Sequence, residues 1–320
     1  MNPHACTSRI AAFVLPLLIT APALPQETAP NHSSKAGLRH VASRDTSPLP
    51  YAQIAAGGVV RIVIPRPTSG TFSPLTEIAV ETAEGKPLMG FGSETTRGAD
   101  LPALIARAGE GSTILLSGSF STTRTIALQA GQALIGAGTL AVKTASGRVM
   151  TVATPVASIE GTVPNDATVS MADNSRLTGL VVTNTSLGTS LSNAYGVWAV
   201  GVHGAVISNN EIRATGTNVA HAVAIAESAR VIVLNNRLSG AGYLPSGLEV
   251  ENSSDLRIAG NTLSASGSQW SNHAIRIANS YVEGGFTADS TGNTIATGSC
   301  QSSGGTSGSI RLAGGGRCPE

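Results

Sequence analysis

An asparagine recurs along the second half of this chain, each time two residues before a branched aliphatic residue. The four copies stand in SNNEI, LNNRL, AGNTL and TGNTI, at Asn210, Asn236, Asn261 and Asn293. Successive copies are 26, 25 and 32 residues apart. A period near 25 residues is typical of one supersecondary unit that is repeated and stacked on its neighbours.

A pair of apolar residues, two positions apart, precedes each of these asparagines. The pairs begin at Val197, Val223, Leu248 and Ile275, and the first three begin thirteen residues before their asparagine. A period of two indicates a strand that presents every second side chain to a core. A unit of this length with only short strands cannot bury its own apolar face. We therefore expect the units to stack into long parallel sheets around a narrow core.

This stacking explains the recurring asparagine. Asparagine tolerates the left-handed backbone of a tight turn. Its amide also bonds readily to the same amide in an adjacent coil, one strand spacing of about 4.8 Å away, and a polar group so near a core needs such partners. We predict that the four asparagines occupy left-handed turns and form a ladder of hydrogen-bonded amides.

A short helix is predicted ahead of the repeat, in ADLPALIARAGEG. Asp100 is its expected N-cap, Pro102 lies in its first turn, and Gly109 ends it. Strand-length apolar runs follow in STILLSGSF, TIALQAG, ALIGAG and TLAVK. Further upstream, VVRIVIPRP (59–67) predicts a strand and LTEIAVETAEG (75–85) a short helix.

Residues 97–320 resemble the right-handed parallel β-helix of the pectin-lyase-like superfamily, an all-β solenoid with a short N-terminal capping helix. The resemblance rests on ISNNEI, VLNNRL, IAGNTL and STGNTI, and on the opening ADLPALIARAGEGSTILLSGSF. It implies a site on the outer face of one parallel sheet, where the polysaccharide lyases and hydrolases of the superfamily hold their substrate. The NTD, DD and GHG motifs of galacturonase-type members are absent from the sequence, as is an acidic cluster for calcium. The resemblance therefore assigns no enzyme activity.

The sheet that matches this site contains GVWAV, AVAIA, GLEVE and AIRIA, with SIRLA (309–313) as a further coil. If the apolar pairs point inward, their neighbours point outward. One outward column then contains Trp198, Ala224, Glu249, Arg276 and Arg311, and a second contains Glu251. Aromatic faces stack on sugar rings, arginines pair with uronate carboxylates, and a carboxylate transfers protons.

We predict catalytic roles for two residues of this column and for two histidines expected just before their strands: Glu249, Arg276, His273 and His221. Substrate-binding roles are predicted for Trp198, Glu251 and Arg311, and for Tyr243 and Trp270 in long loops beside the sheet. The sequence predicts no metal site and no cofactor. The alternative is that Glu249 and Arg276, on adjacent rungs, form an ordinary cross-strand ion pair on an exposed sheet.

The N-terminus has the pattern of an export signal. An apolar run, IAAFVLPLLITAPA, follows Arg9 and ends in the cleavage site Ala21-Pro22-Ala23. The run is too short for the alternative of a membrane anchor. We expect a signal peptide in residues 1–23, a linker and N-terminal extension in 24–96, and a β-helix domain in 97–320. The mature protein should lack a membrane span and be secreted, periplasmic or at the cell surface.

Two cysteines remain after removal of such a signal peptide, Cys300 and Cys318. An even pair in an exported chain favours a disulfide over a metal site. We predict a bond that pins the last strand to the open end of the stack. The alternative is two free thiols or pairing between molecules.

Two functions fit these features. A net charge of +1 with 12% charged residues predicts no nucleic-acid partner. The first function is an exported β-helix that binds or processes a polysaccharide, such as a uronate polymer, on the outer face of one sheet; as an enzyme it would be a polysaccharide lyase or a glycoside hydrolase. The second is a non-catalytic structural or adhesin-like module of the cell envelope. Few coils and irregular loop insertions favour the first.

Overall fold

A computed structural model describes residues 49–65, 74–187, 191–267, 272–278, 286–303 and 308–318. The described residues all belong to one compact unit. The expected signal peptide, and residues 24–48 and 66–73 of the expected linker and N-terminal extension, lie outside the described residues.

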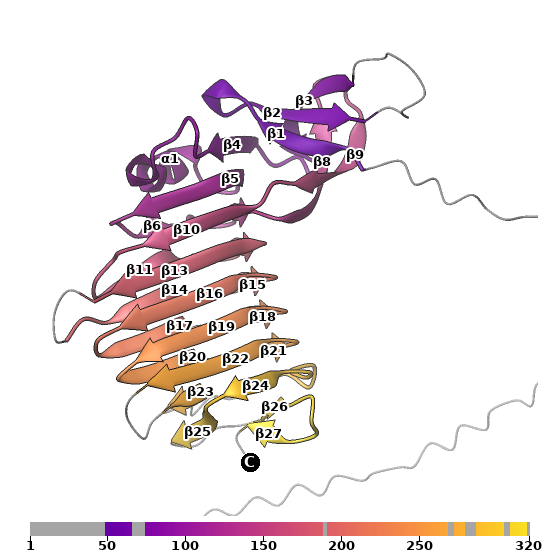
Figure 1. Ribbon diagram of the computed structural model, residues 1–320. Coiled ribbons are helices and arrows are strands. Elements are labelled where there is room, and N and C mark those ends of the chain that lie inside the picture. The colour runs from indigo at the N-terminus through magenta and orange to yellow at the C-terminus, as the bar shows by residue number, and fades with distance from the viewer. Residues whose placement is uncertain are drawn as a thin grey trace, which may run out of the picture. The chain divides into compact units, whose positions relative to one another are not determined.

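The strands of the described unit stack in parallel on those of the preceding coil, as Figure 1 shows, and the fold is the predicted right-handed parallel β-helix. The first sheet contains β4 (Leu88–Gly92), β5 (Thr113–Thr122), β7 (Ala133–Ile135), β12 (Arg176–Thr178), β15 (Val206–Ser208), β18 (Ile232–Leu234) and β21 (Arg257–Ala259). The second continues from β5 to β10 (Ala157–Gly161), β13 (Leu180–Ser186), β16 (Glu211–Gly216), β19 (Arg237–Gly242), β22 (Thr262–Gly267) and β24 (Thr294–Thr297).

The third sheet carries the candidate site. Its strands, in spatial order, are β6 (Ile126–Ala127), β11 (Ala167–Ser170), β14 (Ala194–Val200), β17 (Val219–Ala226), β20 (Leu244–Glu251), β23 (His273–Ala278) and β25 (Ser299–Ser303). The predicted inward residues Val197, Val223, Leu248 and Ile275 lie in register on β14 to β23 and have no exposed surface. Their apolar side chains form part of the continuous core of the solenoid.

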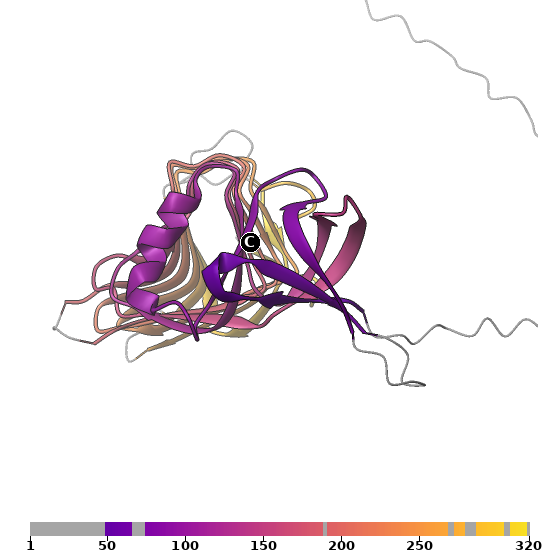
Figure 2. The same cartoon turned by 90° about the horizontal axis from the view of Figure 1, so that it is seen from above.

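The predicted capping helix is α1 (Leu101–Ala108), which follows a short 3-10 helix, η2 (Gly98–Asp100). In Figure 2, which looks down on the stack, α1 lies across its N-terminal end. Leu101 and Ile105 of α1 are fully buried in the solenoid core, so the helix covers apolar side chains that the first coil would expose. Asp100 makes no capping hydrogen bond and instead accepts one from Arg97 Nε at 2.9 Å.

A small closed barrel is formed by three strands that precede the coils in sequence and by two that lie between the coil strands β7 and β10. It contains β1 (Tyr51–Ile54), β2 (Val60–Ile64), β3 (Leu75–Thr82), β8 (Gly138–Thr144) and β9 (Val149–Thr154), with a 3-10 helix, η1 (Ala56–Gly58), between β1 and β2. The strand predicted in 59–67 is confirmed by β2, whereas the helix predicted in 75–85 is wrong because those residues form β3. Pairing with β2 on one side and β8 on the other overrides the local helical preference.

The predicted asparagine ladder is confirmed. Nδ2 of Asn210, of Asn236 and of Asn261 each donates to Oδ1 of the next asparagine, at 3.1, 3.0 and 3.0 Å. The left-handed backbone, however, belongs to the residue before each ladder asparagine: these residues have φ values of 56°, 54°, 65° and 72° and are Asn209, Asn235, Gly260 and Gly292. The first residue of each pair therefore forms the left-handed turn, and the asparagine that follows forms the ladder.

The C-terminal end differs from the predicted coil. SIRLA does not join the third sheet, because β26 (Ile310–Arg311) pairs antiparallel with β27 (Arg317–Cys318), and β25 is the last strand of that sheet. The predicted disulfide between Cys300 of β25 and Cys318 of β27 is confirmed, with the two Cα atoms 5.8 Å apart. Cys300 lies in register with the inward Ile275, so the disulfide ties the last rung of the third sheet to the C-terminal strand.

Candidate functional site

Two columns of outward side chains run across the third sheet. The first contains Trp198, Ala224, Glu249 and Arg276, which lie in register on β14, β17, β20 and β23, as the sequence predicted. Gln301 of β25 continues this column in the place expected for Arg311.

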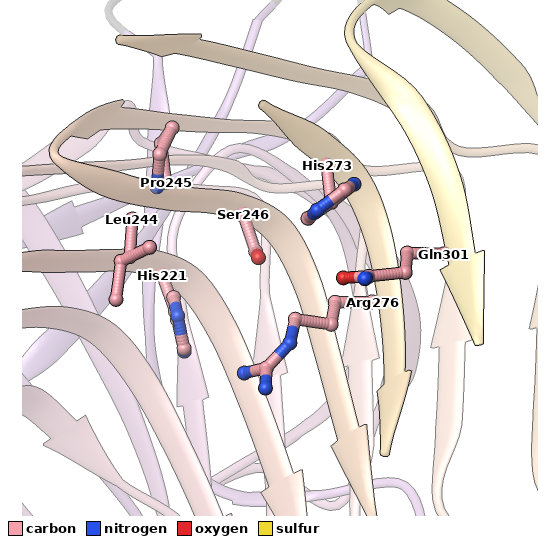
Figure 3. Close-up of a pocket in the computed structure, with 7 residues that line it drawn as sticks. All are labelled: His221, Leu244, Pro245, Ser246, His273, Arg276 and Gln301. Atoms are coloured by element: carbon pink, nitrogen blue, oxygen red, sulfur yellow. The ribbon is translucent and has the colours of Figure 1, made fainter. Parts of the chain in front are cut away.

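The second column contains Tyr195, His221, Ser246, His273 and Ser299 on the same strands. It lies three residues before the first column on most strands, which strict alternation would not allow on one face. On these strands two residues separate the columns, and the pairing register skips the first of the two. This skipped residue is always small: Gly196, Ala222, Gly247 or Ala274. The strands that carry His221, Ser246 and His273 bend in this region (Figure 3). Members of both columns meet there, because Tyr195 stacks on Trp198, and Ser246 and Arg276 line one cavity.

Close packing makes glycine necessary at two of these four positions. A Cβ atom at Gly247 would lie 2.9 Å from the carbonyl oxygen of Ala274, and one at Gly196 would lie 2.6 Å from that of Ala222. A larger residue at either position would separate adjacent coils.

An ion pair joins the first column across two coils. Arg276 Nη1 donates to Glu249 Oε1 at 2.7 Å, while Ser246 Oγ donates to Glu249 Oε2 at 3.4 Å. The Glu249 side chain is 9% exposed and that of Arg276 is 44% exposed. The Glu249 side chain is therefore largely buried, whereas almost half of the Arg276 side chain is open to solvent.

Burial dominates the electrostatics of this pair. It raises the pKa of Glu249 to about 7, although Arg276 and Ser246 act in the opposite direction. Glu251, on the same strand, adds to the rise in the Glu249 pKa through charge repulsion. A carboxyl group with this pKa exchanges its proton near neutral pH, as a general acid or base requires.

A cavity of ≈ 200 Å³ opens beside the pair (Figure 3). Its walls are formed by five residues named above and two new ones. The five are His221, Ser246, His273, Arg276 and Gln301, and the two are Leu244 and Pro245. Polar groups from four adjacent strands thus face one small space, with apolar atoms of the β20 N-terminus at its edge. Such a mixture of apolar surface and a few convergent polar groups is typical of a binding pocket.

The two predicted histidines both line this cavity. They lie within β17 and at the first residue of β23, rather than before these strands as expected. Burial, and to a smaller extent the charge of the nearby Arg276, lower the pKa of His221 to about 3. His273 has a pKa lowered by the same two causes, and its Nδ1 lies 3.0 Å from Ser299 Oγ. Both imidazoles are neutral at neutral pH, and the Nδ1 atom of His221 is buried without a hydrogen-bond partner.

An aromatic pair adjoins the cavity. The rings of Tyr195 and Trp198 are stacked, with centroids 5.0 Å apart and planes 10° from parallel. Tyr195 also meets the edge of His221, with ring centroids 5.6 Å apart. Since His221 lines the cavity, the aromatic pair and the cavity form one continuous surface.

The remaining predicted residues lie farther from this surface or outside the described residues. Glu251 ends β20 and lies in register with Ala226 and Ala278, in the outward row beyond Glu249. Tyr243 is 45% exposed and is the single residue between β19 and β20, so its predicted long loop is wrong. Trp270 lies outside the described residues. Arg311 lies in β26, away from the third sheet.

The sequence analysis missed five residues of the surface: Tyr195, Ser246, Gln301, Leu244 and Pro245. Period-two alternation from Val197 and Leu248 places the first two in the core, and only the bend returns them to the outer face. A glycine or alanine at the same position in successive strands was the sequence signal that could have predicted this bend. Gln301 lies in a strand, SCQSS, that has no apolar alternation.

None of the helices in the described ranges is long and apolar enough to cross a membrane. A family model described as "Periplasmic copper-binding protein (NosD)" matches residues 121–308. No curated protein matches the chain. One similar solved structure is the Dettilon tailspike protein gp208, with 12% sequence identity and a TM-score of 0.41, covering 68% of this chain and 48% of that one. Another is Geobacillus virus E2 ORF18, with 11% sequence identity and a TM-score of 0.31, covering 67% of this chain and 58% of that one. The aligned region spans about half the length of each of these structures.

Proposed function

This chain belongs to the NosD family, and we propose that it is an exported β-helix protein that binds an acidic polysaccharide on the outer face of its third sheet. The periplasmic family confirms the predicted secreted, periplasmic or cell-surface location. The observation that carries the proposal is the buried Glu249 with its pKa near neutrality, paired with the accessible Arg276 at the wall of a cavity.

Arg276 is the proposed anchor for a uronate carboxylate. Its side chain is 44% exposed, and its Nη1 donates to Glu249 Oε1 at 2.7 Å. A guanidinium group has five N–H donors, so further donors remain for a second carboxylate. Gln301, next to Arg276 in the column and also at the cavity wall, adds an amide for sugar hydroxyls.

Glu249 is the proposed proton-transfer group. Its pKa of about 7 keeps a substantial protonated fraction at neutral pH. When a ligand carboxylate occupies Arg276, the carboxyl group loses part of its counter-charge and holds its proton more tightly. A protonated Glu249 can donate to a glycosidic oxygen above the cavity, as a general acid does in glycoside hydrolysis. The neutral His221 and His273 are hydrogen-bonding groups beside it.

Copper, which the family description names, does not fit the donors of this surface. Copper favours imidazole, thiolate and thioether ligands. Among the described residues, no group of three or more His, Cys, Asp or Glu side chains is placed to hold a metal ion, and Cys300 and Cys318 are bonded to each other. The rung between His221 and His273 carries the hydroxyl group of Ser246. The proposal therefore includes no metal-dependent step.

A glycan array followed by calorimetric titration tests the proposal. The probes are oligogalacturonates and oligomannuronates, with neutral oligosaccharides of the same length for comparison. We expect the wild-type protein to bind uronates, and Arg276→Ala to weaken binding at least tenfold with a nearly unchanged melting temperature. Arg257→Ala is the matched control, because Arg257 is an exposed arginine on β21 of the first sheet. Assays for new reducing ends and for unsaturated uronates then distinguish hydrolysis from elimination.

Two results contradict the proposal. One is the absence of uronate binding by the wild-type protein. The other is that Arg276→Ala lowers the melting temperature and leaves uronate binding as strong as in the wild type. Either would favour a structural module of the envelope, in which the Glu249–Arg276 pair only joins two coils.

A further inference from the structure

The stacked pair of Tyr195 and Trp198 takes no part in the ion pair or in the cavity wall. We infer that this pair is a second subsite, which binds a sugar ring through its face, so that the ligand is at least three sugar units long and runs across the strands along the solenoid axis. The inference rests on the proposed function and adds to it the minimum length and the direction of the ligand.

The ring pair offers an apolar surface next to polar groups. Both side chains are half-buried, so each ring has a face or an edge open to solvent. Their stacking fixes both rings, and the edge contact of Tyr195 with His221 holds the pair against the cavity. Rigid aromatic side chains of this kind lose little conformational entropy when a flat ligand covers them.

The spacing of the first column sets the length of the ligand. Trp198 and Arg276 lie on β14 and β23, which are three rungs apart. At about 4.8 Å per rung, the distance along the sheet is roughly 14 Å. A sugar unit in a polymer is about as long as one rung, so a ligand that reaches both residues needs about three units. The rungs between carry Ala224 and the buried Glu249, and neither side chain blocks the path.

The proposed subsite recognises the face of a sugar ring through apolar contact and does not depend on the charge of the sugar. The register neighbours of Tyr195 and Trp198 on the adjacent strands are all uncharged at neutral pH, namely Ala167, Ser170, His221 and Ala224. The pKa of Tyr195 is raised by burial and by the nearby Glu249, which leaves the phenol neutral as well. Contacts here should resist salt, whereas those to Arg276 should weaken as salt screens them.

Titration with galacturonates and mannuronates of one to five units tests the inference. We expect trimers to bind the wild-type protein at least tenfold more tightly than dimers, and this gain to persist at high salt. Trp198→Ala should remove the gain and leave monomer binding unchanged, while Trp198→Phe should keep part of it. Arg276→Ala should weaken binding of every length. Tyr51→Ala is the control, because Tyr51 is a partly exposed aromatic residue in the barrel.

The outcomes separate the two proposals. Equal affinity for dimers and trimers, or an equal loss for monomers and trimers in Trp198→Ala, overturns the second subsite and leaves the proposed function standing. Failure of the wild-type protein to bind any uronate overturns both. If Trp198→Ala unfolds, Trp198→Phe and Tyr195→Ala replace it in the titration. Loss of trimer affinity without loss of monomer affinity, in either variant, supports the second subsite. Wild-type trimer affinity in both variants overturns it.

Discussion

The raised pKa of Glu249 predicts a specific dependence of stability on pH. The carboxyl group has a pKa of about 7 in the folded protein, against an ordinary value of 4.5. Between these pH values the folded protein holds a proton that the unfolded chain has released. The contribution of Glu249 to stability is therefore greatest below pH 4.5, falls as the pH rises from 4.5 to 7, and is lowest above pH 7.

The variant Glu249→Gln removes this titration. The amide of glutamine is nearly the same size and is neutral at every pH. Its oxygen can accept the hydrogen bond from Arg276, while its NH2 group can donate to Ser246 Oγ. Each unit of pKa difference corresponds to about 1.4 kcal/mol. From pH 5 to pH 8, the stability of the variant relative to the wild type should rise by roughly 2–3 kcal/mol.

Urea denaturation of both proteins at pH 5 and pH 8 gives this difference directly. Other titrating groups affect the two proteins alike and cancel in the comparison. Glu160→Gln, which removes an exposed carboxyl group from β10, is the matched control. If the stability of Glu249→Gln relative to the wild type is the same at both pH values, burial does not perturb Glu249. Its proposed role as a proton donor at neutral pH would then fail.

Three further substitutions test the scaffold of the site. Asn236→Leu removes hydrogen bonds to the coils on both sides and leaves the amide of Asn210 without its acceptor, so the free energy of unfolding should fall by about 3 kcal/mol. Its control, Asn235→Gly at the adjacent left-handed position, should change the free energy of unfolding by less than about 0.5 kcal/mol. Replacing Cys300 and Cys318 by serine opens a loop with a separation of 18 residues and should cost about 3 kcal/mol, and an unchanged denaturation midpoint would count against a structural role for the bond. Gly247→Val places a Cβ 2.9 Å from a backbone oxygen and should lower stability by about 2 kcal/mol and weaken uronate binding; wild-type behaviour in both would mean that the bend does not shape the site.

The repeat itself was predictable because one periodic constraint governs many residues. The inward stack of Val197, Val223 and Leu248 follows from alternation, and the amide ladder follows from the recurrence of asparagine at a fixed offset. The assignment of the left-handed turn was wrong by one residue. The signal was present in the pairs NN, NN, GN and GN, because only the first member of each pair varies between asparagine and glycine, the two residues that suit a positive φ.

The last coil was not predictable from alternation. Its strand, β25, has the sequence SCQSS, in which Cys300 occupies the inward position that Ile275 holds one rung before. Without an apolar repeat, SIRLA was the more regular candidate, and Arg311 was assigned to the column in place of Gln301. Long-range pairing with β23 and the disulfide hold β25, and neither has a local sequence signature.

The site depended on a break in the same pattern that predicts the fold. Strict alternation would point Tyr195, His221 and Ser246 into a core where unpartnered polar groups cost about 1–3 kcal/mol each. The bend of four strands at the row of Gly196, Ala222, Gly247 and Ala274 reduces this cost, because it places these side chains beside Trp198 and the cavity, although Nδ1 of His221 remains buried without a partner. The bend also brings Ser246 within hydrogen-bonding distance of Glu249 and Tyr195 against Trp198. A polar residue at an expected inward position, followed by glycine or alanine at the same place in successive coils, is therefore the sequence signal for a functional surface on this solenoid.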